Sequence, residues 1–205
     1  SAPLLGARAT AVRQWLAAAG GQPPEAVEPR VAASVAHLGL AARLVSPALA
    51  LAVLHARPLA FALDEVRWRP VLGGPVPLAL PAAALGGPQR DPDLLAEQLA
   101  AGLLAGPLEE LAAAFARFGV SWHILRGNTA SAVNGAALML ARARPERAAR
   151  AREFAASLLA RPPLAGAGGG IEEGAFRRRS CCLIYRAAPD RKGALCGDCA
   201  LHRPR

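Results

Sequence analysis

The side chains of this chain best suited to chemistry are its four cysteines, and all of them lie near the C-terminus. Cys181 and Cys182 are adjacent. After thirteen intervening residues, Cys196 and Cys199 follow in a Cys-x₂-Cys pattern. Thiolates grouped in this way typically hold a metal ion or a cluster. Four of them satisfy a tetrahedral zinc ion, and they equally satisfy a [2Fe–2S] cluster with two sulfurs on each iron.

The spacing favours the two-iron cluster and leaves two alternatives open. The cysteines of a zinc pair are usually separated by about two to four residues, which let the chain curl round one small ion. Adjacent cysteines suit that curl poorly because neighbouring side chains diverge, and they fit a larger, two-iron object better. A zinc site is the second interpretation, and disulfides or free thiols are the third.

Three segments of the chain together carry a resemblance to a known family. The first runs Arg179-Ser180-Cys181-Cys182-Leu183-Ile184-Tyr185-Arg186 and continues at Cys196-Gly197-Asp198-Cys199. The second is Leu125–Val133, and a looser third covers His37–Leu44 with Ser46-Pro47. These segments resemble the FhuF-like ferric siderophore reductases. The chain departs from the family pattern in its longer interval between the cysteine pairs and in Arg126, which replaces the usual Trp.

The resemblance implies a [2Fe–2S] protein that reduces Fe(III) held by a siderophore. The implied ligands are Cys181, Cys182, Cys196 and Cys199, with no catalytic residue beyond the cluster itself. No flavin or dinucleotide motif is visible, so the electron is expected from a separate donor, a ferredoxin or a flavoprotein reductase. Two rival classes stay open: a non-enzymatic zinc protein that is structural or contacts nucleic acid, and an iron–sulfur sensor.

Positive charge crowds the cysteine-bearing tail. The formal net charge is +9, and almost all of the cationic side chains are arginines, which composition alone explains in part. The functional interpretation is attraction of an anionic substrate or an acidic protein partner. We predict substrate contacts from Arg178 and Arg186 in the tail, and from His123 and Arg126 near the second family-like segment. Nucleic acid is not expected, because no basic–aromatic platform accompanies the charge.

The remaining sequence predicts a mainly α protein with a small β-hairpin (α+β). Hydrophobic residues make up 53% and aromatic residues only 4%, which favours helices packed through small side chains. Glycines and prolines divide the chain into its elements. The expected helices are 7–19, 30–44, 46–55, 92–104, 107–118, 128–144 and 145–159, with a hairpin near 61–80 and a short strand or tight connection at 119–125.

The positions of the glycines and prolines also predict the domain organisation. A helical domain at 1–161 is followed by a Pro/Gly-rich linker at 162–176 and a cluster-binding module at 177–205. The module is too small for an apolar core of its own, so a metal centre or packing on the helical domain must stabilise it.

We expect a cytoplasmic protein without membrane insertion. The N-terminus lacks a basic region followed by an apolar run. The most apolar segment, 31–54, is interrupted by His37, Arg43 and Pro47, and its uncharged part is far shorter than the ~20 residues that span a bilayer. In a reducing compartment, clustered cysteines are more often ligands than disulfides.

Overall fold

The computed structural model of the protein describes residues 2–69, 77–169 and 176–201. Most of these residues are helical, and the few strands are short, so the predicted mainly α class is confirmed. The principal helices are α1 (Ala2–Ala19), α2 (Pro29–His55), α3 (Pro92–Leu99), α4 (Glu109–Ala116), α5 (Trp122–Ala143) and α6 (Ala148–Leu159).

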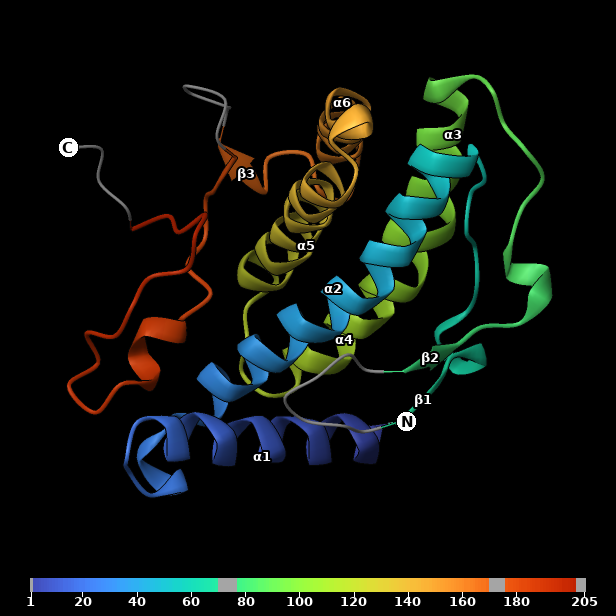
Figure 1. The fold of residues 1–205 in the computed structure, drawn as a ribbon. Coiled ribbons are helices and arrows are strands. Elements are labelled where there is room, and N and C mark those ends of the chain that lie inside the picture. The colour runs from blue at the N-terminus through green and yellow to red at the C-terminus, as the bar shows by residue number, and fades with distance from the viewer. Residues whose placement is uncertain (1, 70–76, 170–175, 202–205) are drawn as a thin grey trace.

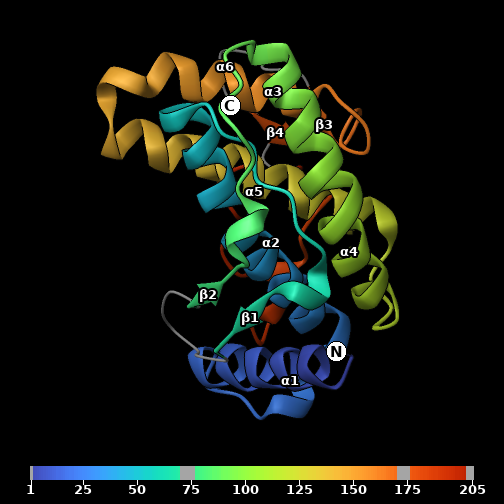
Figure 2. The same ribbon diagram turned by 90° about the vertical axis from the view of Figure 1, so that its right-hand side faces the viewer.

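The helices pack around α2 and α5. These two lie against each other, α6 covers α5, and α1 packs against α2. In both Figure 1 and Figure 2, α1 lies across the lower end of the other helices. Alanine makes this close packing possible, since many of the buried positions of α2 and α5 are alanines or other small residues. The core is one continuous cluster that extends from α1 to α6 and reaches Ala187 in the C-terminal tail.

The strands form two minimal antiparallel pairs. β1 (Arg67–Trp68) pairs with β2 (Leu78–Ala79), which confirms a small hairpin within the predicted 61–80 segment. Residues 70–76, between the two strands, lie outside the described residues. A second pair joins β3 (Gly168–Gly169) to β4 (Arg177–Arg178) and holds the start of the C-terminal tail beside the glycine-rich segment.

Two prolines that we expected to start helices lie inside helical segments instead. Pro47 is within α2, which continues through the predicted break at residues 45–46. Burial of Leu44, Val45, Ala48 and Leu49 on both sides of the proline favours one continuous helix over two. Pro107 lies in a π-helical segment, η4 (Ala100–Leu108), which joins α3 to α4. Its wider turn accommodates the proline ring that an α-helix would exclude.

The segment before α5 also differs from the prediction. Residues 119–121 form a connection, and α5 begins at Trp122 with the Ser121 hydroxyl accepting a bond from the Ile124 amide at 3.4 Å. Asn128, where we expected a helix to begin, lies inside α5 and is fully buried. The Asn128 side chain therefore makes tertiary contacts and does not cap the helix.

The predicted boundaries at 162–176 stay a prediction, but the described part of that segment is well packed. Leu164 is 1% exposed and belongs to the core, and Ala167 is also buried. The Arg179 amide donates to the Ala167 carbonyl oxygen at 3.1 Å, beyond the β3–β4 pair. The segment before the tail is therefore packed into the core, and the beginning of the tail is hydrogen-bonded to that segment.

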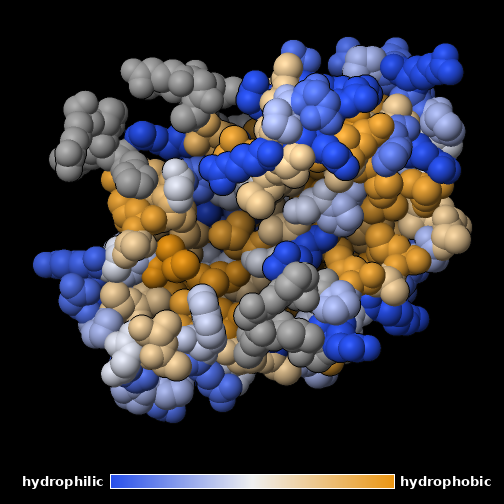
Figure 3. Space-filling model, in the orientation of Figure 1, coloured by the Kyte–Doolittle hydropathy of each residue, from blue (hydrophilic) through white to orange (hydrophobic). Residues whose placement is uncertain are grey.

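Two helical stretches, Pro29–His55 and Pro92–Ala116, are long and apolar enough to cross a membrane by length and composition. Half of the most apolar window in each is buried inside the protein, as in the core helices of many globular domains. Figure 3 shows one face on which apolar surface occupies much of the middle and hydrophilic side chains gather at the margins. The prediction of no membrane insertion stays a prediction.

Candidate metal centre

The cysteine-bearing tail lies along one side of α5 and reaches the beginning of α2. Figure 1 shows it on the left of the bundle, and β4 contacts α5 while the short helix η7 (Ile184–Ala187) packs against α2. The Gln22 side chain donates to the Ala187 carbonyl oxygen at 2.6 Å, which ties η7 also to the loop after α1. The tail thus contacts three separate parts of the helical domain.

All four cysteines are free thiols that face one another in two pairs. The sulfurs of Cys182 and Cys196 lie 3.5 Å apart, and the thiol of Cys181 interacts with that of Cys199. Each member of the adjacent pair therefore faces one member of the Cys-x₂-Cys pair. Cys182 and Cys199 are buried, each 1% exposed, and the other two are partly exposed. Each facing pair thus combines one buried cysteine with one that is partly exposed.

Backbone amides are directed at the sulfurs. The Leu183 amide donates to Cys181 Sγ at 3.3 Å, and the Leu201 amide donates to Cys199 Sγ at 3.4 Å. Leu183 itself adopts a left-handed backbone conformation with φ of 70°, which turns the chain immediately after the adjacent cysteines. Amide bonds to sulfur stabilise thiolate charge and raise the reduction potential of a cluster.

The protein environment separates the acidities of the thiols. Hydrogen bonding to Cys196 lowers the pKa of Cys182 to about 6 against the opposing effect of burial, and the Ile184 amide and the Arg178 charge lower it further. The same bond, together with burial, raises the pKa of Cys196. Burial likewise raises the pKa of Cys181. Within the Cys182–Cys196 pair, the surroundings therefore favour the thiolate of Cys182.

A buried arginine lies next to the thiols. Arg178 is only 1% exposed, and its Nη2 donates to Asn128 Oδ1 at 2.7 Å and, over longer distances, to the Ile124 carbonyl oxygen and Ser180 Oγ. Its Nε and Nη1 have no hydrogen-bond partner among the described residues. The positive charge is close enough to lower the pKa of Cys182. The sequence-based interpretation of Arg178 as a substrate contact is not supported, because its guanidinium is closed off from solvent.

Asn128 extends this contact across the bundle to α2. Its Nδ2 donates to both the carbonyl oxygen and the hydroxyl of Ser34, at 3.0 and 3.1 Å. The Ser34 hydroxyl in turn donates to the carbonyl oxygen of Cys182 at 2.8 Å. A series of buried hydrogen bonds thus links Arg178 to Asn128 on α5, continues to Ser34 on α2, and ends at the backbone of Cys182. Sequence reasoning missed Ser34, for which no local signal exists, although Asn128 lies within the family-like 125–133 segment.

His37 lies deeper in the same region. It is fully buried, contacts Phe115 edge-on with ring centroids 5.5 Å apart, and neither ring nitrogen has a partner among the described residues. Burial, and secondarily the charge of Arg178, lowers its pKa to about 3. The ring is therefore neutral at physiological pH and is available only as a packed, uncharged side chain.

These features fit a [2Fe–2S] group better than an empty thiol cluster. A buried cation with two unpartnered donors requires a counter-charge, and no carboxylate forms an ion pair with Arg178 in the part of the chain that the structure describes. A cluster held by four thiolates has a net negative charge that increases on reduction, and its sulfurs accept hydrogen bonds. The two facing pairs, Cys182 with Cys196 and Cys181 with Cys199, would supply the two sulfurs per iron that a [2Fe–2S] cluster needs.

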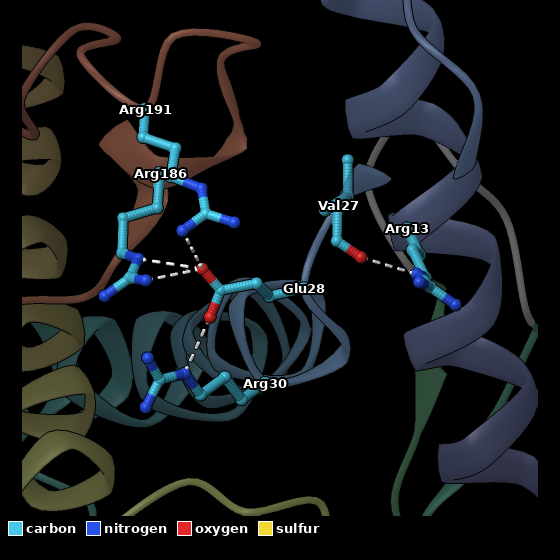
Figure 4. A network of polar contacts seen from close by, with 6 residues as sticks. All are labelled: Arg13, Val27, Glu28, Arg30, Arg186 and Arg191. Atoms are coloured by element: carbon cyan, nitrogen blue, oxygen red, sulfur yellow. Dashed lines mark hydrogen bonds and ion pairs between the residues drawn. The ribbon is translucent and has the colours of Figure 1, made fainter. Parts of the chain in front are cut away.

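The second predicted substrate contact, Arg186, is part of an ion-pair network with Glu28 at the start of α2. Its Nη2 lies 2.6 Å from Glu28 Oε1, Arg30 bonds the other carboxylate oxygen at 2.9 Å, and Arg191 lies at 3.8 Å (Figure 4). Burial raises the pKa of Glu28, but the bonds to Arg30 and Arg186 outweigh it and lower the pKa overall. Arg186 thus fastens the tail to α2 and is only partly accessible to a substrate.

The other two predicted contacts, His123 and Arg126, line one shallow hollow of about 260 Å³ together with residues of the 163–167 segment. His123 Nε2 lies 3.3 Å from the Arg179 carbonyl oxygen. Arg126 pairs with Glu109 at 3.2 Å and lies over the Trp122 ring at 5.6 Å from its centroid. Both side chains are exposed, and the hollow adjoins the chain two residues before Cys181.

Residues 178–201 match the family model described as the FhuF 2Fe-2S C-terminal domain. The cysteine-bearing segment is therefore similar to the FhuF-type 2Fe-2S domain, which confirms both the resemblance and the predicted cofactor. The match covers this C-terminal part of the 205-residue chain. No curated protein and no solved structure shows significant similarity to the chain.

Proposed function

We propose that this protein is a cytoplasmic ferric siderophore reductase whose [2Fe–2S] cluster is held by Cys181, Cys182, Cys196 and Cys199. The observation that carries the proposal is the coincidence of a FhuF-type 2Fe-2S match with four facing thiols and a buried, uncompensated Arg178. When bound, the cluster supplies one electron at a time to a ferric ion that remains in its chelate.

Reduction of the chelated iron is also what releases it. Siderophore oxygens are hard donors that hold Fe(III) tightly and Fe(II) much more weakly. One electron added to Fe(III) yields Fe(II), and the freed ligand oxygens take up protons from water. The protein therefore needs to place the chelate near the cysteine loops, and it needs no residue in the first coordination shell of the iron.

The chain's own residues perform three tasks in this proposal. The amides of Leu183 and Leu201 and the guanidinium of Arg178 stabilise negative charge on the sulfurs. Burial of Cys182 and Cys199 keeps water from half of the ligand set. The partly exposed Cys181 and Cys196 lie on the side from which an electron can leave.

The test of the ligands is chemical analysis of protein prepared anaerobically with sufficient iron. We expect about two irons and two acid-labile sulfides per chain, and loss of the cluster when any of the four cysteines is changed to Ser. Stoichiometric zinc without labile sulfide would instead support the non-enzymatic zinc protein.

The test of the reaction follows the cluster absorption. A low-potential one-electron donor, such as a reduced ferredoxin, should bleach the protein, and a ferric siderophore should then restore the oxidised spectrum. NAD(P)H alone should not bleach it, because a hydride carries two electrons and a one-electron centre does not accept it directly. A cluster that is stable in the presence of excess ferric chelate, combined with tight, salt-sensitive DNA binding, would favour the sensor class.

The predicted contacts His123 and Arg126 define one of two hollows near the cysteine loops that are tested separately as the site of the chelate. Both side chains are exposed and line one hollow, so His123→Ala and Arg126→Gln can be tested without disturbing the core. We expect weaker binding of the chelate if this hollow takes part.

A further inference from the structure

A second hollow lies beside the cysteine loops. It has a volume of about 580 Å³, within the range of pockets that hold small ligands. Its walls come from the C-terminal half of α5, from α6, and from the turn between Cys196 and Cys199. It shares no lining residue with the hollow of His123 and Arg126.

One wall of this groove is the cysteine loop itself. Gly197 and Asp198, the two residues between Cys196 and Cys199, both line it. The Ser131 hydroxyl of α5 donates to Asp198 Oδ2 at 2.6 Å, and the Arg178 amide donates to the Asp198 carbonyl oxygen at 3.1 Å. The turn is thereby held against the groove, so that a molecule in the groove touches the loop that carries two of the proposed ligands.

The rim of the groove is basic. Arg142 at the end of α5 and Arg152 on α6 both line it and are exposed. Neither makes an ion pair or hydrogen bond within the described residues. The Asp198 carboxylate is the acidic group among the lining residues, and the Ser131 hydroxyl already occupies one of its oxygens. The field in the groove therefore favours negatively charged groups.

The floor of the groove is largely apolar. Leu38, Leu138, Leu159 and Phe176 line it, and Leu138 is 43% exposed to solvent. Exposed apolar side chains next to unpaired guanidinium groups suit a molecule with a hydrocarbon scaffold and anionic substituents. A ferric chelate of the siderophore type has this composition, since its scaffold is organic and its charge is carried by oxygens.

We infer that this groove is the binding site for the ferric chelate and that Arg142 and Arg152 select chelates with peripheral carboxylate groups. The inference rests on the proposed function and adds the location and charge class of the substrate. The metal centre of the chelate then lies beside the Cys196–Cys199 turn, and no covalent bond to the protein is formed.

The test uses gallium(III), which is redox-inert and has the coordination chemistry of Fe(III), so that binding is measured without electron transfer. The probes are gallium complexes of one synthetic tris-hydroxamate scaffold that bears a pendant carboxylate, amide or ammonium group. Titration calorimetry on the cluster-loaded protein should give the tightest binding for the carboxylate and the weakest for the ammonium complex. The Arg142→Gln/Arg152→Gln variant should bind the carboxylate complex roughly tenfold more weakly and lose the discrimination.

The matched control is Arg144→Gln/Arg150→Gln, which removes the same charge from two exposed arginines, each two residues from its counterpart and outside the groove. It should bind like the wild type. Ala156→Trp, at an exposed groove position, should block all three complexes while the cluster absorption stays unchanged.

The outcomes separate this inference from the proposed function. Wild-type protein that binds the gallium complexes and is reoxidised by the iron complexes, with equal affinities in both arginine variants and in Ala156→Trp, overturns the groove and leaves the reductase intact. Wild-type protein that binds no gallium complex and is not reoxidised by the iron complexes contradicts the proposed function and this inference with it.

Discussion

The Nη2 atom of Arg178 donates to Oδ1 of Asn128 at 2.7 Å inside the protein, where both residues are essentially closed to solvent. The bond joins the first residue of the matched 2Fe-2S segment to the N-terminal third of α5. Asn128 continues the link to Ser34 on α2, and Ser34 returns it to the Cys182 carbonyl oxygen. The helical domain is thereby coupled to the cysteine loop through polar bonds in addition to apolar packing.

The first prediction concerns the charge of Arg178. Replacement by Gln retains a donor for Asn128 but removes the positive charge beside Cys182. Reduction adds negative charge to the cluster, so loss of a nearby cation should disfavour the reduced form. We expect the potential to fall by roughly 60 mV, which corresponds to a tenfold change for a one-electron couple. Spectroelectrochemistry on the cluster-loaded protein measures this reduction potential.

Arg186→Gln is the control for this prediction. Arg186 is near the cysteines in sequence, but its guanidinium is paired with Glu28 and partly exposed, so its charge is already compensated and screened by water. The reduction potential of the Arg186→Gln variant should stay close to that of the wild type. Equal shifts in the two variants would show that the burial of Arg178 has no special electrostatic effect.

The cofactor could be predicted from the sequence, and Arg178 was among the arginines expected beside it, but the sequence did not show that Arg178 alone is buried. The Cys-Cys and Cys-x₂-Cys pattern is local, and it carries the chemistry whatever the surrounding fold. Arg178 looks like its exposed neighbours Arg177 and Arg179 in the sequence. Only the pairing of β4 with β3 and the docking against α5 turn this one side chain inward. That selection depends on tertiary contacts between residues far apart in the chain.

The second prediction concerns the approach of the tail to α5. A Cβ atom at Gly127 would lie 2.0 Å from the Ser180 hydroxyl oxygen and 3.1 Å from Arg178 Nη2, so Gly127→Ala must displace the residue that precedes Cys181. We expect a loss of about 1–3 kcal/mol in the free energy of unfolding and faster loss of the cluster. Chemical denaturation and the decay of visible absorption measure the two effects.

Gly39→Ala is the matched control because Gly39 is also inside a long helix, is exposed, and has open space where the Cβ would lie. Alanine there should stabilise the protein by up to about 1 kcal/mol through helix propensity. We therefore expect the two alanine substitutions to change the free energy of unfolding in opposite directions. If Gly127→Ala also stabilises the protein and leaves cluster decay unchanged, the close approach of the tail to α5 is not required.

Helix boundaries could be predicted where a single residue determines them. They were predicted less well where tertiary packing determines them. The Gly20-Gly21 end of α1 and the Asp91-Pro92 start of α3 follow from local capping chemistry and match the structure. Pro47 and Pro107 gave equally strong local signals, yet both lie within helical segments that bury apolar residues on each side. The gain from burial exceeds the local cost of a proline in these two places.

The third prediction concerns the attachment of the tail to α2 by Glu28. Glu28→Gln removes the ion pairs to Arg186 and Arg30 while keeping the size of the side chain. Because these groups are partly exposed, we expect a loss of less than about 1 kcal/mol in global stability. The local effect should be larger: faster hydrogen exchange in residues 184–187, with a difference from wild type that shrinks as salt screens the pairs.

The control is Glu110→Gln on α4, a carboxylate exposed in the structure and distant from the tail in sequence. It changes the net charge by the same amount and should leave exchange in residues 184–187 unaltered. If Glu28→Gln also leaves it unaltered at low salt, the ion pairs do not hold the tail in place.

The last prediction is a pH dependence of stability caused by His37. Its pKa in the folded protein is about 3, against an ordinary value of 6.5, because burial and the charge of Arg178 disfavour the imidazolium. Between these values the unfolded chain binds a proton that the folded chain does not. Stability is therefore fully present above pH 6.5 and falls as the pH decreases toward 3, with a limiting slope of about 1.4 kcal/mol per pH unit from this residue.

His37→Leu keeps a buried apolar side chain of similar size and removes the titrating group. The variant should lose stability less steeply than the wild type between pH 6.5 and 4, by close to one proton in the slope, when unfolding of the loaded protein is followed with urea at each pH. His55→Leu, at the exposed end of α2, serves as the control and should retain the wild-type slope. Acid loss of the cluster and titration of carboxylates affect all three proteins alike, so they cancel in the comparison. Parallel curves for His37→Leu and the wild type would mean that His37 finds a partner for its proton inside the folded protein.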